Sequence, residues 1–128
     1  MRRQYVRIVA AALAMMAGIT AFAAYPDKPV RVIVPFPAGG PVDTVTRVVA
    51  ERISSELKQT VVVENRAGAA GQIGSEAAAN STADGYTLLM GSSSTHSLPT
   101  LLGQKLAYNP VSSFAPVGLV GLSPTQYL

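Results

Sequence analysis

From Tyr25 onward, the apolar positions alternate between a strand period and a helix period. Residues 30–34 form a β-branched run that stops at Pro35, which predicts a buried strand. From Pro41, apolar side chains recur at helical spacing and predict a helix of about four turns. Pro41 suits the first turn, and Asp43 lies where the helix dipole favours an anion. The apolar positions of this helix are Val42, Val45, Val48, Val49, Ile53 and Leu57.

The rest of the chain repeats this alternation. We predict strands at residues 61–63, 86–90 and 117–122, a helix at 73–79 and a helical turn at 98–102. Strands that alternate with helices indicate an α/β fold with a parallel sheet. In such sheets, ligands bind beyond the carboxyl ends of the strands. The loops that follow the first three strands are rich in glycine, serine, threonine or proline, and they span residues 35–40, 68–74 and 91–97.

Residues 1–23 have the pattern of a secretory signal peptide. A basic start is followed by an alanine-rich apolar run that ends in the small-x-small sequence Ala21-Phe22-Ala23. We expect cleavage after Ala23 and export by the general secretory route, although Arg2-Arg3 leaves the twin-arginine route open. A membrane anchor is the alternative, but the run is short and weakly apolar for a membrane span. The protein is therefore expected in the periplasm, with residues 24–128 as its mature part.

Removing this leader changes the charge of the chain. The net charge is +3, and three basic residues (Arg2, Arg3 and Arg7) lie in the leader, so the mature part is close to neutral. Scattered charges without a basic patch argue against a nucleic-acid partner. The chain has no cysteine and one histidine, which excludes a thiol nucleophile, a lipid-anchored cysteine and a multi-histidine metal site. We expect no metal and no cofactor.

The first loop is the strongest candidate for a binding site. Its Pro37-Ala38-Gly39-Gly40 sequence leads directly into a predicted helix start. Unpaired N–H groups and the positive end of the helix dipole attract carboxylates or phosphates there. Two adjacent glycines leave the backbone open to a ligand. The plainer interpretation is a tight strand-to-helix turn that needs flexible backbone angles.

The other two loops offer alternatives. Residues 68–74 read Gly-x-x-Gly-x-x-Gly, which differs from the dinucleotide and P-loop patterns, although a nucleotide-binding domain stays open. Arg66 before this loop is expected to form a structural ion pair. Residues 91–97 suit hydrogen bonding to a polar solute through Ser92, Ser93, Ser94, Thr95 and His96. An α/β hydrolase using Ser94 or His96 is the second alternative, but Thr95 stands where a nucleophile elbow requires glycine.

Several separated segments together resemble one receptor family. The segment that reads Tyr-Pro-Asp-Lys-Pro-Val-Arg-Val-Ile-Val-Pro-Phe-Pro-Ala-Gly-Gly, at residues 25–40, is similar to the start of the Bug-type (TctC-like) receptors of tripartite tricarboxylate transporters. The resemblance covers essentially the whole mature chain. It continues in the same order through residues 41–43, 61–66, 68–74, 84–89, 108–110 and 114–117.

The resemblance implies a periplasmic-binding-protein-like (type II) fold, with two α/β lobes around a cleft. It implies a receptor that captures a dicarboxylate, tricarboxylate, acidic amino acid or related organic acid for the membrane subunits of a tripartite transporter, without catalysis. A complete receptor of this kind is expected to be a monomer. Family members are much longer, so residues 24–128 are expected to form an incomplete first lobe without the second lobe. A non-functional truncated receptor is therefore a further alternative.

The same resemblance implies where a ligand is held. Backbone groups and ordered waters on two opposed strand–turn–helix segments supply most of the contacts in this family. Residues 91–96 match another part of the cleft wall. The first of the two segments matches Phe36, Pro37, Ala38, Gly39 and Gly40, with Asp43 beside it.

Overall fold

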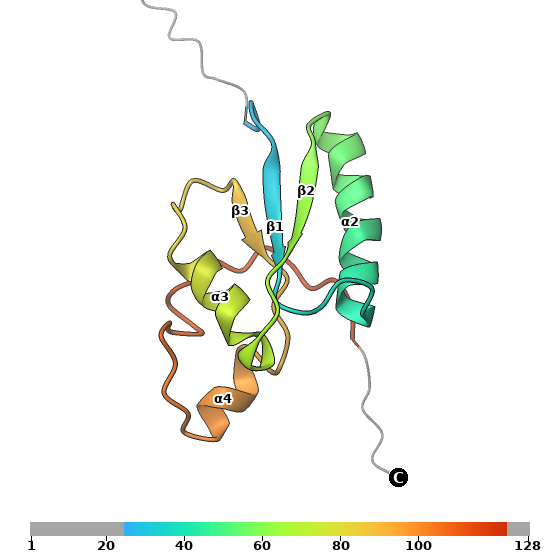
Figure 1. Ribbon diagram of the computed structural model, residues 1–128. Coiled ribbons are helices and arrows are strands. Elements are labelled where there is room, and N and C mark those ends of the chain that lie inside the picture. Colours follow the sequence, from blue (N-terminus) through green and yellow to red (C-terminus); the bar gives the residue numbers. More distant parts are fainter. Residues whose placement is uncertain (1–24, 123–128) are drawn as a thin grey trace, which may run out of the picture.

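The computed structural model describes residues 25–122 (Figure 1). The predicted signal peptide lies outside these described residues, as do residues 123–128. Within residues 25–122, no helix combines the length and apolar character needed to cross a membrane. The elements in chain order are β1 (Val30–Val34), α2 (Pro41–Leu57), β2 (Val61–Asn65), the short 3-10 helix η1 (Ala69–Gly71), α3 (Gln72–Ala79), β3 (Thr87–Leu89) and α4 (Ser97–Leu101).

A parallel three-stranded sheet organises the described residues. The strand order is β2-β1-β3, so β1 lies in the centre. In the register, Val34 of β1 lies beside Asn65 of β2, and Ile33 lies beside Leu89 of β3. The centre of β1 is the core, because the side chains of Val30, Ile33 and Val34 are at most 1% exposed. The predicted α/β class with a parallel sheet is confirmed.

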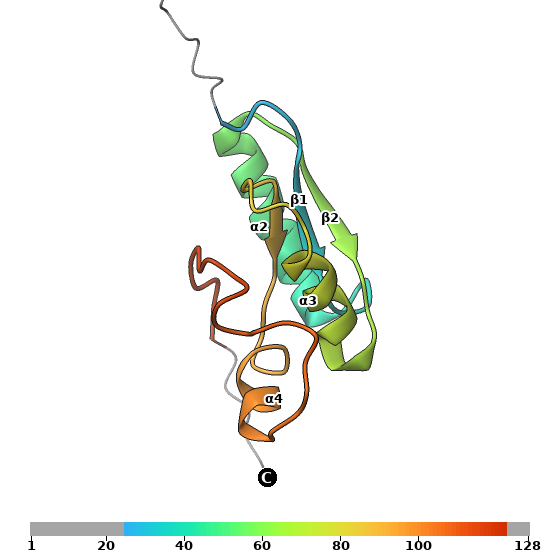
Figure 2. The same cartoon turned by 90° about the vertical axis from the view of Figure 1, so that its left-hand side faces the viewer.

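Helices cover the two faces of the sheet. Helix α2 packs on β2 and β1, whereas α3 packs on β3 and β1 from the other side (Figure 1). The strands end at the edge of the sheet where α2 begins, and α4 lies beyond that edge in both views (Figures 1 and 2). The ends of the three strands therefore point toward the region that carries the candidate loops.

The predicted fourth strand at residues 117–122 is wrong. This segment is coil, and its side chains are exposed, with Val117 at 87% and Leu122 at 85%. A strand needs a neighbouring strand to pair its N–H and C=O groups. Among residues 25–122, no strand pairs with residues 117–122, although β2 and β3 are edge strands with one side unpaired. The apolar pattern alone could not supply that partner.

Gly74 shows how closely α3 approaches the end of β1. A Cβ atom on Gly74 would lie 2.7 Å from the Arg66 carbonyl oxygen and 2.8 Å from the Pro35 Cα atom. These are backbone atoms, which cannot move aside as a flexible side chain can. Gly74 is buried, and its missing side chain lets the helix contact the loop after β1.

We expect Gly74→Ala to lower the free energy of unfolding by ~1–3 kcal/mol, because the added methyl group overpacks this contact. Urea denaturation followed by circular dichroism measures the change. Gly118→Ala is the matched control, since a Cβ atom at Gly118 would meet no other atom within 4 Å, and it should be near neutral. Equal stability of the two variants would contradict the close approach of α3.

Candidate functional site

The three loops after the strands meet at one edge of the sheet. The Arg66 amide donates to the Val34 carbonyl at 2.8 Å, and the Met90 amide donates to the Ile33 carbonyl at 2.9 Å. These hydrogen bonds place the beginnings of the second and third loops beside the end of β1. Deeper in the cluster, a Cβ atom on Gly71 would lie 2.6 Å from Thr95 Cγ2. The three loops, which the sequence places after the carboxyl ends of parallel strands, therefore lie together.

The first loop forms a tight turn that presents its backbone to solvent. Gly39 has a φ of +80°, a left-handed conformation that glycine adopts without strain. The Gly40 amide donates to the Pro37 carbonyl at 3.3 Å, which closes the turn. Pro37, Ala38 and Gly39 are exposed, and Phe36 is half-buried. Helix α2 then begins at Pro41, which has no N–H group, and Gly40 supplies no side-chain cap, so the Val42 and Asp43 amides have no hydrogen-bond partner in the described part of the chain.

The carboxylate of Asp43 holds this turn from beneath. Asp43 is 2% exposed. Its Oδ2 atom accepts hydrogen bonds from the Gly39 amide at 2.8 Å and from Arg47 Nε at 3.0 Å. Its Oδ1 atom accepts one from Asn65 Nδ2 at 2.9 Å. The bonds from Arg47, Gly39 and Asn65, in that order of size, lower the pKa of Asp43 from 3.8 to about 2.

This geometry changes the roles expected of the glycine pair and Asp43. The sequence predicted a backbone open to a ligand at this glycine pair, and in this conformation both glycine amides are already used within the protein. The Gly39 amide is bonded to Asp43, and the Gly40 amide to Pro37. Asp43 is turned inward with all of its bonds made within the protein. Direct ligand contact by the first-loop residues stays a prediction, and the uncapped start of α2 is the part that remains open.

The third loop is folded around Thr95. Its buried hydroxyl accepts from the Ser92 amide at 2.9 Å and donates to the Ser92 carbonyl at 3.0 Å. The Tyr108 hydroxyl donates to the Thr95 carbonyl at 2.6 Å. Ser92 and Ser94 lie with their hydroxyl oxygens 3.0 Å apart, and Ser93 is exposed. Thr95 therefore supports the loop, whereas the serines lie nearer to solvent.

The ring of His96 is partly buried between the third loop and Phe114. Its Nδ1 atom lies 2.8 Å from the Thr95 hydroxyl oxygen, and its ring packs on Phe114 with centroids 5.1 Å apart. Burial lowers the pKa of His96 below its usual value. The third loop thus brings an imidazole and two serine hydroxyls to the same edge as the first loop.

Comparison with known proteins identifies the family of this site. Residues 45–128 match the tripartite tricarboxylate transporter family receptor (TctC). The chain belongs to this receptor family. Its members are solute-binding receptors rather than enzymes, and the fold agrees with solved members.

Individual members of the family match the chain over part of their length. Protein BugT of Bordetella pertussis is 47% identical over 104 residues, which are 78% of this chain and 31% of BugT. A structure described as a periplasmic transporter has a TM-score of 0.64 and 46% identity, over 69% of this chain and 30% of that one. MatC from Rhodopseudomonas palustris, solved with bound malate, has a TM-score of 0.68 and 38% identity, over 75% and 33%. The chain spans about a third of the length of these relatives.

Membership of a receptor family agrees with how Ser94 and His96 lie. The Ser94 hydroxyl is paired with Ser92, and the His96 Nδ1 atom contacts Thr95 instead of a serine. A nucleophile needs its base within hydrogen-bond reach, and this pair does not show that contact. Within residues 25–122, no group of three or more metal-ligating side chains comes together.

The second loop of this receptor is a packing element. Two of its glycines are tightly packed, because a Cβ atom on Gly71 would lie 2.6 Å from Thr95 Cγ2 and one on Gly74 would lie 2.8 Å from Pro35 Cα. Arg66 pairs with Glu64, which confirms the structural ion pair that the sequence predicted. The pKa of Glu64 is lowered, first by its hydrogen bond from Arg66.

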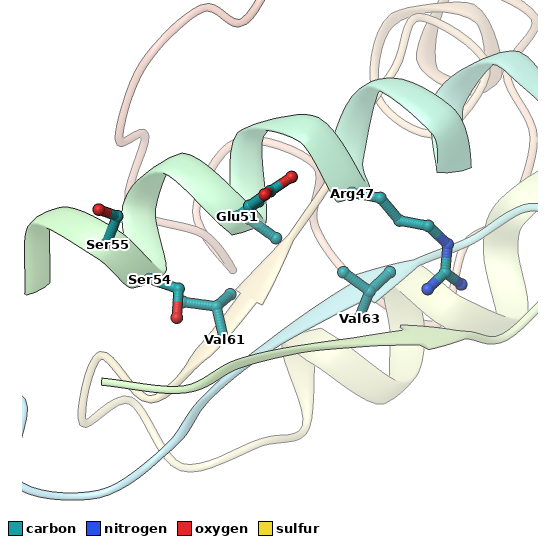
Figure 3. Close-up of a pocket in the computed structure, with 7 residues that line it drawn as sticks. Arg47, Glu51, Ser54, Ser55, Val61 and Val63 are labelled. Carbon is teal, nitrogen blue, oxygen red and sulfur yellow. The ribbon is translucent and has the colours of Figure 1, made fainter. Parts of the chain in front are cut away.

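A separate groove lies away from the three loops. It has a volume of about 400 Å³ and runs between α2 and β2 (Figure 3). None of the residues predicted to bind a ligand lines it. Arg47 is at one end of the groove, and its Nε atom is committed to Asp43. The groove is lined by Arg47, Ala50, Glu51, Ser54, Ser55, Val61 and Val63.

Sequence reasoning missed Asn65 and Arg47. Asn65 follows directly on the apolar run of the second strand, at the carboxyl end where polar groups of α/β proteins gather. Arg47 lies four residues after Asp43, a spacing that favours an ion pair on a helix. The sequence contains both signals, but only the parallel register of β1 and β2 brings Asn65 beside Asp43 and Arg47.

We expect Asp43 to make the stability of the protein depend on acid pH. Its folded pKa of about 2 lies below the ordinary value of 3.8, so its contribution is present above pH 3.8 and is lost as the pH falls toward 2. Asp43→Asn should lower stability at pH 7 and flatten the loss of stability between pH 4 and pH 2. Urea titrations across this pH range measure both effects.

Glu56→Gln serves as the control, because Glu56 forms an exposed pair with Arg52 on the same helix. This variant should keep the acid dependence of the wild type. An Asp43→Asn protein with the wild-type pH profile would show that the buried carboxylate is not the group responsible.

Proposed function

We propose that this chain forms one wall of a receptor site that captures a small organic acid in the periplasm. Such a receptor presents its ligand to the membrane subunits of a tripartite tricarboxylate transporter. The proposal is supported by family membership and by the solved relative MatC, which has malate bound. In this proposal, residues 1–23 are a cleavable signal peptide and residues 24–128 belong to the first lobe.

One observation carries the proposal: an exposed backbone turn is held rigidly at an uncapped helix start. The turn at residues 37–39 is exposed, and the first N–H groups of α2 have no side-chain cap. Those N–H groups and the helix dipole favour a negatively charged oxygen. Because Asp43 fixes the Gly39 amide, a ligand does not have to order the turn when it binds. Less ordering at binding leaves more of the interaction energy as affinity.

The charge of Asp43 does not conflict with an anionic ligand. Its carboxylate is buried beneath the turn and is neutralised by the Arg47 guanidinium. The ligand carboxylate would lie on the opposite, solvent-facing side of the turn. The third loop, with Ser92, Ser94 and His96, contributes uncharged hydrogen-bonding groups to the same edge of the sheet. The selecting contacts to the rest of the ligand belong to the part of a receptor beyond this third of its length.

A chimaeric receptor tests this proposal. Residues 25–122 replace the matching third of MatC, which supplies the remaining wall, and malate binding is measured by calorimetry. We expect Gly39→Val to weaken malate binding by at least about tenfold, or ~1.4 kcal/mol. A Cβ atom on Gly39 meets no protein atom within 4 Å, so the branched side chain would project into the space offered to the ligand.

Gly103→Val is the matched control. Gly103 has a φ of +64° and no atom within 4 Å of its Cβ position, so it carries similar backbone strain. It lies after α4 and outside all three loops, and it should leave malate affinity unchanged. A folded chimaera without malate affinity would count against organic-acid capture. Equal affinity of the two glycine variants would remove the first loop from the site.

A further inference from the structure

We propose that Asn65 is the positioning residue of the ligand-binding turn. The inference rests on the proposed function, because it concerns the turn at residues 36–40 that would receive the carboxylate. Asn65 is not offered as a ligand contact. Its side chain acts through the turn and through Asp43, by fixing both relative to the end of the sheet.

The Asn65 amide joins three segments that are distant in the sequence. Its Nδ2 atom donates to the Phe36 carbonyl at 3.1 Å and to Asp43 Oδ1 at 2.9 Å. Its Oδ1 atom accepts from Arg47 Nη2 at 3.0 Å. One side chain therefore joins the loop turn, the first two helical turns of α2 and the end of β2.

The register of the sheet explains why this position can do so. Asn65 lies beside Val34 in the parallel ladder, and the turn begins two residues after Val34. The Asn65 side chain is on the α2 side of the sheet, as shown by its bonds to Asp43 and Arg47. The two donated bonds therefore tie the turn and Asp43 to the end of β2.

Only a side-chain amide fits the three contacts. Two of the partners are acceptors (the Phe36 carbonyl and the Asp43 carboxylate), and the third is a guanidinium donor. An amide has two N–H donors and one carbonyl oxygen, which matches this set. An aspartate at residue 65 would place a carboxylate against that of Asp43, and an apolar residue would leave the Phe36 carbonyl without its donor.

Asn65 affects the turn indirectly, through its hydrogen bond to the Asp43 carboxylate. Asn65 holds Oδ1 while Oδ2 receives the Gly39 amide, so the carboxylate is fixed at both oxygens. Without Asn65, the carboxylate keeps Arg47 but is free to rotate away from Gly39. The Gly39 amide then opens to water more often, and the turn loses its preset shape while β1 and β3 stay paired.

Amide hydrogen exchange on the full chain tests this inference without a ligand. The Gly39 amide reports on the turn, and the Met90 amide, bonded to the Ile33 carbonyl, reports on the sheet. We expect Asn65→Ala and Asn65→Asp to speed exchange at Gly39 by about tenfold or more relative to Met90. Asn80→Ala is the control, because Asn80 is exposed at the end of α3, and it should leave the ratio unchanged.

A second variant separates positioning from general support. Asp43→Asn in the Asn65→Asp background removes the facing carboxylates and returns one amide and one charge to the pair, so Gly39 should regain part of its protection. An unprotected Gly39 amide in the wild type would overturn the inference. So would an unchanged Gly39-to-Met90 ratio, or equal loss at both amides in both Asn65 variants. None of these results depends on carboxylate binding, which the chimaera tests separately.

Discussion

The buried carboxylate of Asp43 is the interaction on which the candidate site depends. A buried charge is costly unless hydrogen bonds and an opposite charge replace the water that it loses. Here a backbone amide, a guanidinium and a side-chain amide supply those bonds. They come from the first loop, from α2 itself and from the end of β2. The same hydrogen bonds therefore stabilise the buried charge and fix the shape of the turn.

This arrangement separates the exposed surface of the turn from its support. Gly39 has a left-handed backbone conformation and no side chain to cover the turn. The Asp43 carboxylate accepts a hydrogen bond from the Gly39 amide and so holds the turn from the protein side. Arg47 balances the charge of Asp43 on the protein side. An approaching anion therefore meets the positive end of α2 instead of an unbalanced carboxylate. A flexible glycine pair becomes a preformed surface through contacts that lie beneath it.

Local pattern was enough to predict β1, α2 and the parallel α/β class, because periodicity and β-branched composition act within a few residues. The segment 117–122 has the same apolar character, yet it forms no strand, because a strand also requires hydrogen-bonded pairing with a neighbouring strand, which this segment does not make. The bond between Asn65 and Asp43 spans 22 residues and exists only in one register of β1 and β2. The bond from the Gly39 amide to Asp43 is local, but no residue pattern in the loop distinguished it from a free amide.

The first loop offers backbone groups and the third loop offers side chains, and this difference bears on how such a receptor would select its ligand. Thr95 is committed to bonds within its own loop, and the serines beside it partly satisfy each other. The unpaired donors at this edge of the sheet therefore come mainly from the backbone start of α2. Backbone donors distinguish an acid from a neutral group, but they do not distinguish one acid from another. Under the proposed function, a site of this composition would bind carboxylates as a class and would leave the choice among them to side chains elsewhere in a complete receptor.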